Sequence, residues 1–231
     1  MKLISENLKK IILDIFYPNR CPCCNGFIRW NEIICDKCVS DIEEMENPDF
    51  CPLCGRNPCI CDSGLFYDRA FVYKPYDGAI RNGVISMKRG NNTNFAEYAG
   101  EKLAAMLESC QDIDCIIPVP MSAAKKRSRG YNQAELISDK ISEILGIPVR
   151  NDILFMIYSK KEQHSKNAKQ RAEIKNYLEI NENADLSEMK IIICDDVITT
   201  SSTVNACAEL LKSKGAAEVT AVLASGTVLK I

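Results

Sequence analysis

Residues 191–203 place two acidic and five hydroxyl side chains directly around the end of an apolar run. The run at 191–194, Ile-Ile-Ile-Cys, has the composition of a buried parallel strand, and open α/β sheets bind ligands where such strands end. The hydroxyl-rich turn then opens a predicted helix, whose N-terminus offers unpaired N–H groups to an anion. Carboxylates suit sugar hydroxyls and Mg²⁺, so the segment predicts a sugar phosphate site. Its candidate residues are Asp195, Asp196, Val197, Ile198, Thr199, Thr200, Ser201, Ser202 and Thr203.

Cysteines form a second cluster, because nine of the 13 lie between positions 21 and 61. Three CxxC pairs have the spacing of zinc knuckles, and Cys59-x-Cys61 is a shorter fourth pair. Such pairs predict one or two structural Zn²⁺ ions, since four thiolates leave no open position for catalysis. Cys23 is an alternative ligand to Cys24, and an iron–sulfur cluster is an alternative to zinc. Assigned in order, the ligands are Cys21, Cys24, Cys35 and Cys38 in one site and Cys51, Cys54, Cys59 and Cys61 in the other.

Cationic side chains gather in two polar segments, residues 122–130 and 160–171. The first follows a predicted strand that must end at Pro118-Val119-Pro120, and it carries Lys125, Lys126, Arg127 and Arg129 as cations for phosphates. Gly130 would allow close backbone approach, and Asn132 and Gln133 can hydrogen-bond a ligand. The alternative is that both segments are solvated surface.

The spacing of apolar residues predicts the elements that position these groups. Strands are expected over 68–73, 115–119, 153–158, 177–180, 190–194 and 218–224, and helices over 79–87, 94–107, 133–145 and 202–214. Residues 122–130 are predicted to form a loop. The alternation predicts an α/β fold with a mostly parallel sheet over residues 65–231, preceded by an amphipathic helix (1–18) and a small Cys-rich zinc module (19–64).

Composition limits the classes of function. The 231 residues are 46% hydrophobic, so a hydrophobic core is expected. The formal net charge is −2, so the overall charge of the protein does not favour nucleic acid binding. Charged residues interrupt the apolar pattern of the first 16 positions, and no apolar stretch approaches the length of a membrane span. We therefore expect a cytoplasmic protein with reduced thiols.

Three features together resemble the ComF family. These are the N-terminal cysteine knuckles, the segment Arg129-Gly130-Tyr131-Asn132-Gln133, and the run at 195–203, which looks like the phosphoribosyl pyrophosphate loop of type I phosphoribosyltransferases. The resemblance implies the type I phosphoribosyltransferase fold, with Asp195 and Asp196 receiving the ribose hydroxyls near Mg²⁺. It further implies that residues 199–203 cradle the 5-phosphate. Lys88, Gln163 and Arg171 match other family positions, the last two within a segment (160–171) suited to cover the site.

This chain departs from the family at Ser201, where the loop usually has glycine. If the backbone there requires positive φ, serine costs about 1 kcal/mol in strain. Its hydroxyl would still be able to contact a phosphate. The departure bears on affinity, not on the fold.

The resemblance implies a phosphoribosyltransferase-type protein linked to natural competence, which handles incoming single-stranded DNA alongside other competence proteins. The alternatives are a phosphoribosyltransferase of nucleotide or related metabolism with an unknown acceptor, and a non-catalytic sensor of phosphoribosyl pyrophosphate. Without the other motifs, the acid pair could merely cap the following helix. Phe27 and Trp30 are expected to pack the zinc module, with base stacking as the alternative, and His164 is expected at the surface.

Overall fold

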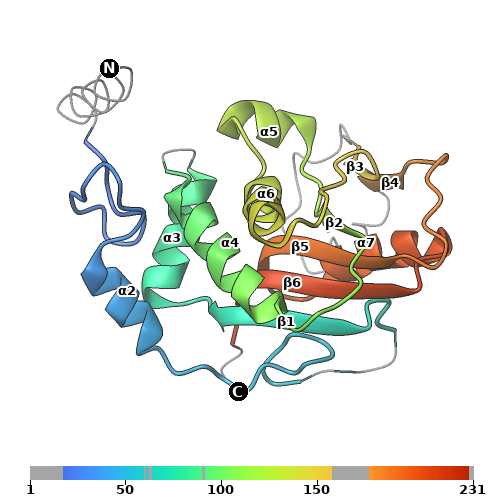
Figure 1. Cartoon of the computed structure of the whole chain (residues 1–231), viewed down its shortest axis with the longest axis horizontal. Helices are drawn as coiled ribbons and strands as arrows, with labels where there is room; N and C mark the ends of the chain where they lie inside the picture. The colour runs from blue at the N-terminus through green and yellow to red at the C-terminus, as the bar shows by residue number, and fades with distance from the viewer. Residues whose placement is uncertain (1–17, 60, 62–63, 90–91, 158–176, 229–231) are drawn as a thin grey trace, which may run out of the picture.

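A four-stranded parallel sheet forms the centre of the molecule (Figure 1). The computed structural model describes residues 18–59, 61, 64–89, 92–157 and 177–228. The strands lie in the order β1-β6-β5-β2, formed by β1 (Arg69–Pro75), β6 (Glu218–Gly226), β5 (Lys190–Ile198) and β2 (Cys115–Pro118). The predicted parallel sheet is confirmed, and β5 lies inside it with β6 on one side and β2 on the other.

Helices cover both faces of this sheet, which explains why β5 is apolar on both sides. Ile192 and Cys194 pack with α3 (Gly78–Lys88), α4 (Asn94–Leu107) and α6 (Gln133–Leu145). Ile191 and Ile193 point the other way and pack with α7 (Ser202–Ser213). Figure 1 shows α4 and α6 in front of the sheet and α7 behind it.

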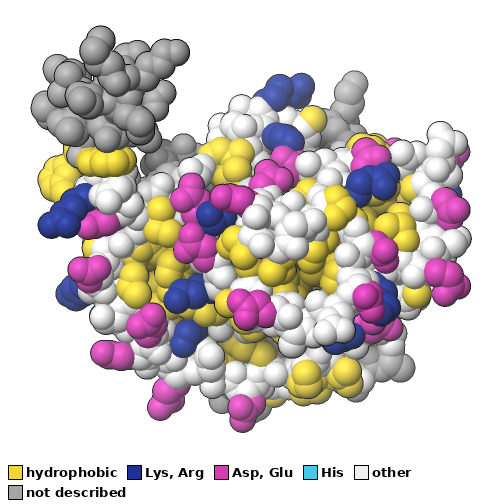
Figure 2. All heavy atoms as spheres, viewed as in Figure 1, with side chains coloured by type: hydrophobic (Ala, Val, Ile, Leu, Met, Phe, Trp, Pro, Cys, Tyr) yellow, Lys and Arg dark blue, Asp and Glu magenta, His cyan; other side chains and the backbone are white. Residues whose placement is uncertain are grey.

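Two glycines let helices approach closely on the front face. A Cβ on Gly83 of α3 would lie 2.2 Å from the ring of Phe95, and a Cβ on Gly100 of α4 would lie 2.6 Å from Cβ of Lys140 on α6. Larger residues at either position would push the helices apart. Outside this contact, acidic and basic side chains are interspersed over the face of α4 and α6 (Figure 2), and Lys140 lies 3.6 Å from Glu101.

The two halves of the Cys-rich module join different cores. Ile28, Ile34 and Ile42, from the first half and from α2 (Asp36–Glu43), belong to the core that contains α3 and α4. Phe50 and Leu65, which flank the second half, pack against the core that contains α7. The two cysteine clusters therefore support opposite sides of the sheet.

Several boundaries differ from the sequence prediction. Residues 122–130 are not a loop, because α5 (Ala123–Arg129) fills them. Ser122 caps its start and Gly130, with φ of 90°, ends it, so caps and helix-forming Ala, Lys and Arg outweigh the lack of an apolar face. β5 extends through the acid pair, and β3 (Leu154–Met156) pairs antiparallel with β4 (Leu178–Ile180) apart from the main sheet. The helix predicted at 1–18 lies outside the described residues except for its last position.

Candidate functional site

The acid pair lies within the last residues of β5 and differs between its two members. Asp196 is buried, at 8% exposed, and its Oδ2 lies 3.0 Å from Nζ of Lys88 at the end of α3. Oδ1 of Asp195 accepts a hydrogen bond of 2.8 Å from the Asp196 backbone N–H. Burial and the adjacent Asp196 carboxylate raise the pKa of Asp195 well above its ordinary value. The structure thus gives Lys88 a role that the sequence left open, as the cation facing the acid pair.

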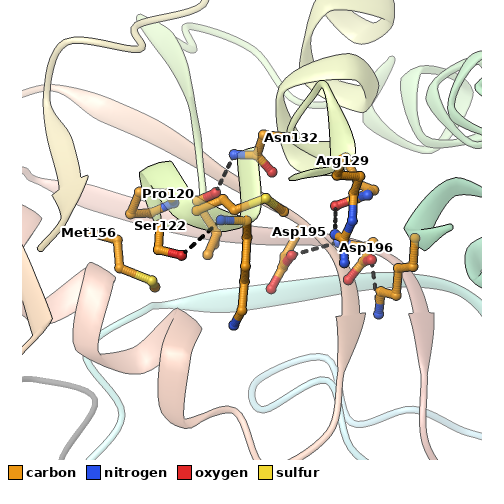
Figure 3. A pocket seen from close by; sticks show the side chains of 12 residues that line it. Pro120, Ser122, Arg129, Asn132, Met156, Asp195 and Asp196 are labelled. Carbon is orange, nitrogen blue, oxygen red and sulfur yellow. Dashed lines mark hydrogen bonds and ion pairs between the residues drawn. The ribbon is translucent and has the colours of Figure 1, made fainter. Parts of the chain in front are cut away.

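A cavity of about 340 Å³ opens above the acid pair (Figure 3). The cationic side chains of Lys88, Lys125 and Arg129 line it together with the two aspartates. Figure 3 shows Arg129 and Asp196 on one side of Asp195, with Pro120, Ser122 and Met156 on the other. Three cations around two carboxylates suit a ligand with hydroxyl groups next to a phosphate or pyrophosphate.

The segment 129–133 joins the walls of this cavity. Asn132 caps the N-terminus of α6 and donates a hydrogen bond of 2.9 Å to the carbonyl of Val119, the residue that follows β2. Gln133 accepts a hydrogen bond of 2.6 Å from Arg129 and donates one of 3.3 Å to the carbonyl of Met87, next to Lys88. Both amide side chains are buried and bonded within the protein, so in this structure they hold Arg129 and the end of α3 in place.

The hydroxyl-rich turn surrounds a smaller hollow at the N-terminus of α7. Ser201 has φ of 63°, the left-handed conformation that favours glycine, and it is 8% exposed. Its Oγ is buried and forms no hydrogen bond with the described residues. Thr200 and Ser202 pair through their hydroxyls at 3.0 Å. An unpartnered buried hydroxyl beside free helix N–H groups is a site for an anion.

Asp195 lines both hollows, so the acid pair lies between the basic cavity and the turn. Val197 and Ile198 connect the two within β5, where the Ile198 side chain is buried in the core. Any contact from Ile198 to a ligand must therefore come from its backbone.

Each cysteine cluster brings four sulfurs together. Sγ atoms of Cys21, Cys24, Cys35 and Cys38 lie within 4.8 Å of one another, as do those of Cys51, Cys54, Cys59 and Cys61. Four thiolates bound tetrahedrally at about 2.3 Å from zinc lie about 3.8 Å apart. Cys24–Cys35 (3.8 Å) and Cys54–Cys59 (3.9 Å) match this separation, whereas Cys51–Cys61 (3.3 Å) and Cys59–Cys61 (3.1 Å) are closer together. Both clusters therefore suit a structural zinc ion, and their members match the sequential assignment.

The knuckle backbone favours a thiolate at Cys51. Burial acts to raise the pKa of Cys51, but N–H groups of Cys54 and Leu53 lower it to about 6. Cys23, the alternative ligand, lies outside the first group, and burial raises its pKa. Away from the clusters, Cys115, Cys194 and Cys207 are buried core residues, whereas Cys110 is only partly buried.

Some predicted residues are not placed at the site. Gln163, Arg171 and His164 lie outside the described residues. Phe27 and Trp30 are 69% and 43% exposed, so neither is a core residue of the zinc module, and the Arg20 guanidinium lies 4.1 Å from the centre of the Phe27 ring.

Sequence reasoning missed two residues behind the hydroxyl-rich turn, Tyr67 and Asn205. Burial raises the pKa of Tyr67 to about 12. The Asn205 backbone N–H donates to the Ser201 carbonyl at 2.8 Å. Neither belongs to a recognisable motif, so only the tertiary structure reveals them.

Comparison with known proteins assigns both parts of the chain. Residues 118–226 match the family described as phosphoribosyl transferase domain, and residues 12–68 match the double zinc ribbon domain. The chain thus combines a double zinc ribbon with a phosphoribosyl transferase domain, which agrees with the parallel sheet and the two Cys₄ sites.

Its relatives include competence proteins. Competence protein F of Haemophilus influenzae is 37% identical over 109 residues, 46% of this chain and 47% of that protein. Competence protein ComFC of Bacillus subtilis is 25% identical over 203 residues, 81% of each chain. DNA utilization protein YhgH of Escherichia coli O157:H7 is 32% identical over 107 residues, 46% of each. The chain spans about half the length of the first and last of these relatives.

These matches confirm the resemblance to the ComF family: the chain is a homologue of the ComF competence proteins. None of the described helices combines the length and the apolarity needed to cross a membrane.

Proposed function

We propose that this chain binds phosphoribosyl pyrophosphate with Mg²⁺ and acts as a phosphoribosyltransferase. The observation that carries the proposal is the acid pair between two anion sites. A ribose with phosphate at one end and pyrophosphate at the other has the same order of groups. Asp195 and Asp196 would accept hydrogen bonds from the ribose hydroxyls, the turn at 199–203 would hold the 5-phosphate, and the cations of the larger cavity would hold the pyrophosphate.

The reaction would break the bond from ribose C1 to pyrophosphate while an acceptor forms a new bond to C1. Positive charge develops on the ribose ring as the leaving group departs, so anchoring both ends of the substrate is the main task of the protein. Lys88, Lys125 and Arg129 would stabilise the negative charge on the pyrophosphate. Adjacent carboxylates fit the Mg²⁺ preference for one or two carboxylates plus substrate oxygens, and the ion would supply further charge neutralisation to the leaving group.

Space for an acceptor lies next to the proposed ribose site. A second cavity of about 260 Å³ shares Pro120, Met121 and Met156 with the first. Phe155 and Arg150 also line it, so it offers an apolar wall and a cation. An acceptor placed there would approach the end of β2 and hence the side of the cavity opposite Arg129.

Calorimetry with phosphoribosyl pyrophosphate and Mg²⁺ tests the proposal. The double variant Asp195→Asn/Asp196→Asn should bind at least about 100-fold more weakly, because two hydrogen bonds to charged groups are weakened. Asp112→Asn is the control, since Asp112 pairs with Lys190 at the opposite end of β5. Equal affinity of the double variant and the wild type would overturn the assignment. Tight binding without pyrophosphate release across a set of acceptors would instead identify a sensor.

A basic cleft favours nucleic acid binding as a second function. A cavity of about 670 Å³ lies between the first zinc ribbon and α3, and Arg20, Arg81 and Arg89 line it. Among the described residues that line it, none is acidic. The exposed ring of Phe27 lies beside Arg20, where a base could stack. Part of this positive charge balances the thiolates of the first zinc site. The rest supports handling of single-stranded DNA, in keeping with the names of the relatives.

The salt dependence of oligonucleotide binding separates these roles of the arginines. If the cleft contacts phosphates, Arg81→Ala/Arg89→Ala should reduce the slope of log affinity against log salt by about 1.4 for a labelled single strand. Lys214→Ala, at the far end of α7, should leave the slope unchanged. An unchanged slope in the arginine variant would remove the cleft from the DNA site.

A further inference from the structure

The second zinc ribbon, residues 51–61, lies directly against the strand that leads into the hydroxyl-rich turn. Gly55, with φ of 66°, packs on β1 and on the end of β5, because an added Cβ would lie 3.0 Å from Cβ of Ala70 in β1 and 3.4 Å from Cδ1 of Ile198. Ile198 is the last residue of β5, immediately before Thr199. The knuckle that holds two zinc ligands thus forms the wall behind the start of the turn.

Tyr67 connects a zinc ligand with the turn. Tyr67 is 3% exposed, and its hydroxyl donates a hydrogen bond of 2.9 Å to the carbonyl of Cys54. The Tyr67 ring also belongs to the core cluster that contains Ile198 and Val204, which lie on either side of the turn. One buried ring therefore links the second zinc site to the residues that flank the turn.

Asn205 fastens the chain after the ribbon to the first turn of α7. Its side chain accepts a hydrogen bond of 2.7 Å from the Phe66 N–H and donates one of 2.9 Å to the Gly64 carbonyl. Its own N–H donates to the Ser201 carbonyl. The segment between the ribbon and β1 is therefore tied to the turn by a side chain that spans 139 positions in sequence.

The ribbon has few apolar residues, so zinc supplies much of its folding free energy. The strained backbone at Ser201 persists only if its surroundings hold it. We infer that zinc in the second site, and not zinc in the first, holds the phosphate turn in its binding geometry, with Tyr67 and Asn205 as positioning residues. The part of this inference that concerns ligand affinity rests on the proposed function; the mechanical coupling does not.

Paired removal of zinc ligands tests the coupling in the full chain. Cys59→Ser/Cys61→Ser removes zinc from the second site, and Cys24→Ser/Cys35→Ser removes it from the first as the matched control. Without any ligand, amide hydrogen exchange over residues 199–205 should speed up at least about tenfold in the second-site variant and stay within about twofold in the control. Equal exchange in the two variants would overturn the inference.

Ligand binding supplies a second measurement that general unfolding would not reproduce. Ribose 5-phosphate affinity should fall about tenfold in the second-site variant while pyrophosphate affinity stays within about twofold, because pyrophosphate uses the cavity of Lys88 and Arg129. Equal losses for both ligands would indicate unfolding and refute a specific role. If the wild type binds neither ligand, the proposed function fails, and hydrogen exchange alone decides the coupling.

Milder variants keep both zinc ions and isolate the connecting residues. Tyr67→Phe and Asn205→Ala should each retain the zinc content of the wild type and lose about three- to tenfold in ribose 5-phosphate affinity. By linkage, ribose 5-phosphate should slow zinc loss from the second site to a chelator in the wild type and less so in these variants. Wild-type affinity in both variants would show that the ribbon does not act through these residues.

Discussion

Replacing Ser201 by glycine should raise the stability of the ligand-free protein and weaken phosphate binding. Ser201 has φ of 63° and a buried Oγ that forms no hydrogen bond with the described residues. A left-handed backbone at a residue other than glycine costs about 1 kcal/mol, and a buried unsatisfied hydroxyl costs about 1–2 kcal/mol. The greater backbone freedom of glycine in the unfolded chain destabilises the folded state by about 0.7 kcal/mol and so offsets part of this gain. Ser201→Gly should therefore stabilise the apoprotein by about 1–2 kcal/mol.

Ser201→Ala separates the two contributions. Alanine keeps the left-handed strain and removes only the hydroxyl, so it should stabilise the apoprotein by about 1 kcal/mol, less than glycine does. Both variants lose a hydrogen bond to a charged phosphate, which is worth about 1.5 kcal/mol, so both should bind ribose 5-phosphate about tenfold more weakly.

Urea unfolding at fixed zinc concentration measures the stability change, and it is interpretable if the denaturant slope is the same for all three proteins. Calorimetry with ribose 5-phosphate measures the affinity. A glycine variant less stable than the wild type would refute the strain argument. Undiminished ribose 5-phosphate affinity in both variants would show that the Ser201 hydroxyl does not face the phosphate.

Three further outcomes follow from the structure. Lys88→Met breaks a 3.0 Å ion pair with a carboxylate whose side chain is 11% exposed, so it should cost about 1–2 kcal/mol in urea unfolding, and most of this cost should vanish when Asp196→Asn is added. Because the pKa of Asp195 is raised in the folded state, the stability of the apoprotein should fall as the pH rises from 3.8, the ordinary pKa of this carboxyl group, through the raised pKa. Asp195→Asn should flatten that part of the pH profile. Gly83→Ala places a Cβ 2.2 Å from the Phe95 ring and should destabilise the fold by about 1–2 kcal/mol, whereas a stable variant would mean that α3 and α4 adjust freely.

The acid pair, the cysteine pairs and most helices and strands could be predicted from the sequence, because each depends on residue types and spacing within a short segment. The helix over 94–107 has the predicted bounds, because its apolar spacing and its core contacts agree. α5 was missed because none of its residues is buried, so it lacks the apolar period on which the prediction depended. Its caps, Ser122 and Gly130, were the signals that indicated a helix.

The remaining features depend on contacts between distant parts of the chain. The position of Lys88 against Asp196 depends on how α3 packs on the sheet. Tyr67 reaches Cys54 and the Ser201 region only because the second ribbon folds against the back of the sheet. Asn132 and Gln133 were expected to bind a ligand, and their hydrogen bonds to Val119 and Met87 became visible only in the folded chain.

A crystal structure of the protein with phosphoribosyl pyrophosphate and Mg²⁺ tests the central claim most directly. We expect the 5-phosphate within the turn at 199–203, the ribose hydroxyls on Asp195 and Asp196, and the pyrophosphate beside Lys88 and Arg129. A ligand bound elsewhere, or bound with its pyrophosphate in the turn, would contradict it.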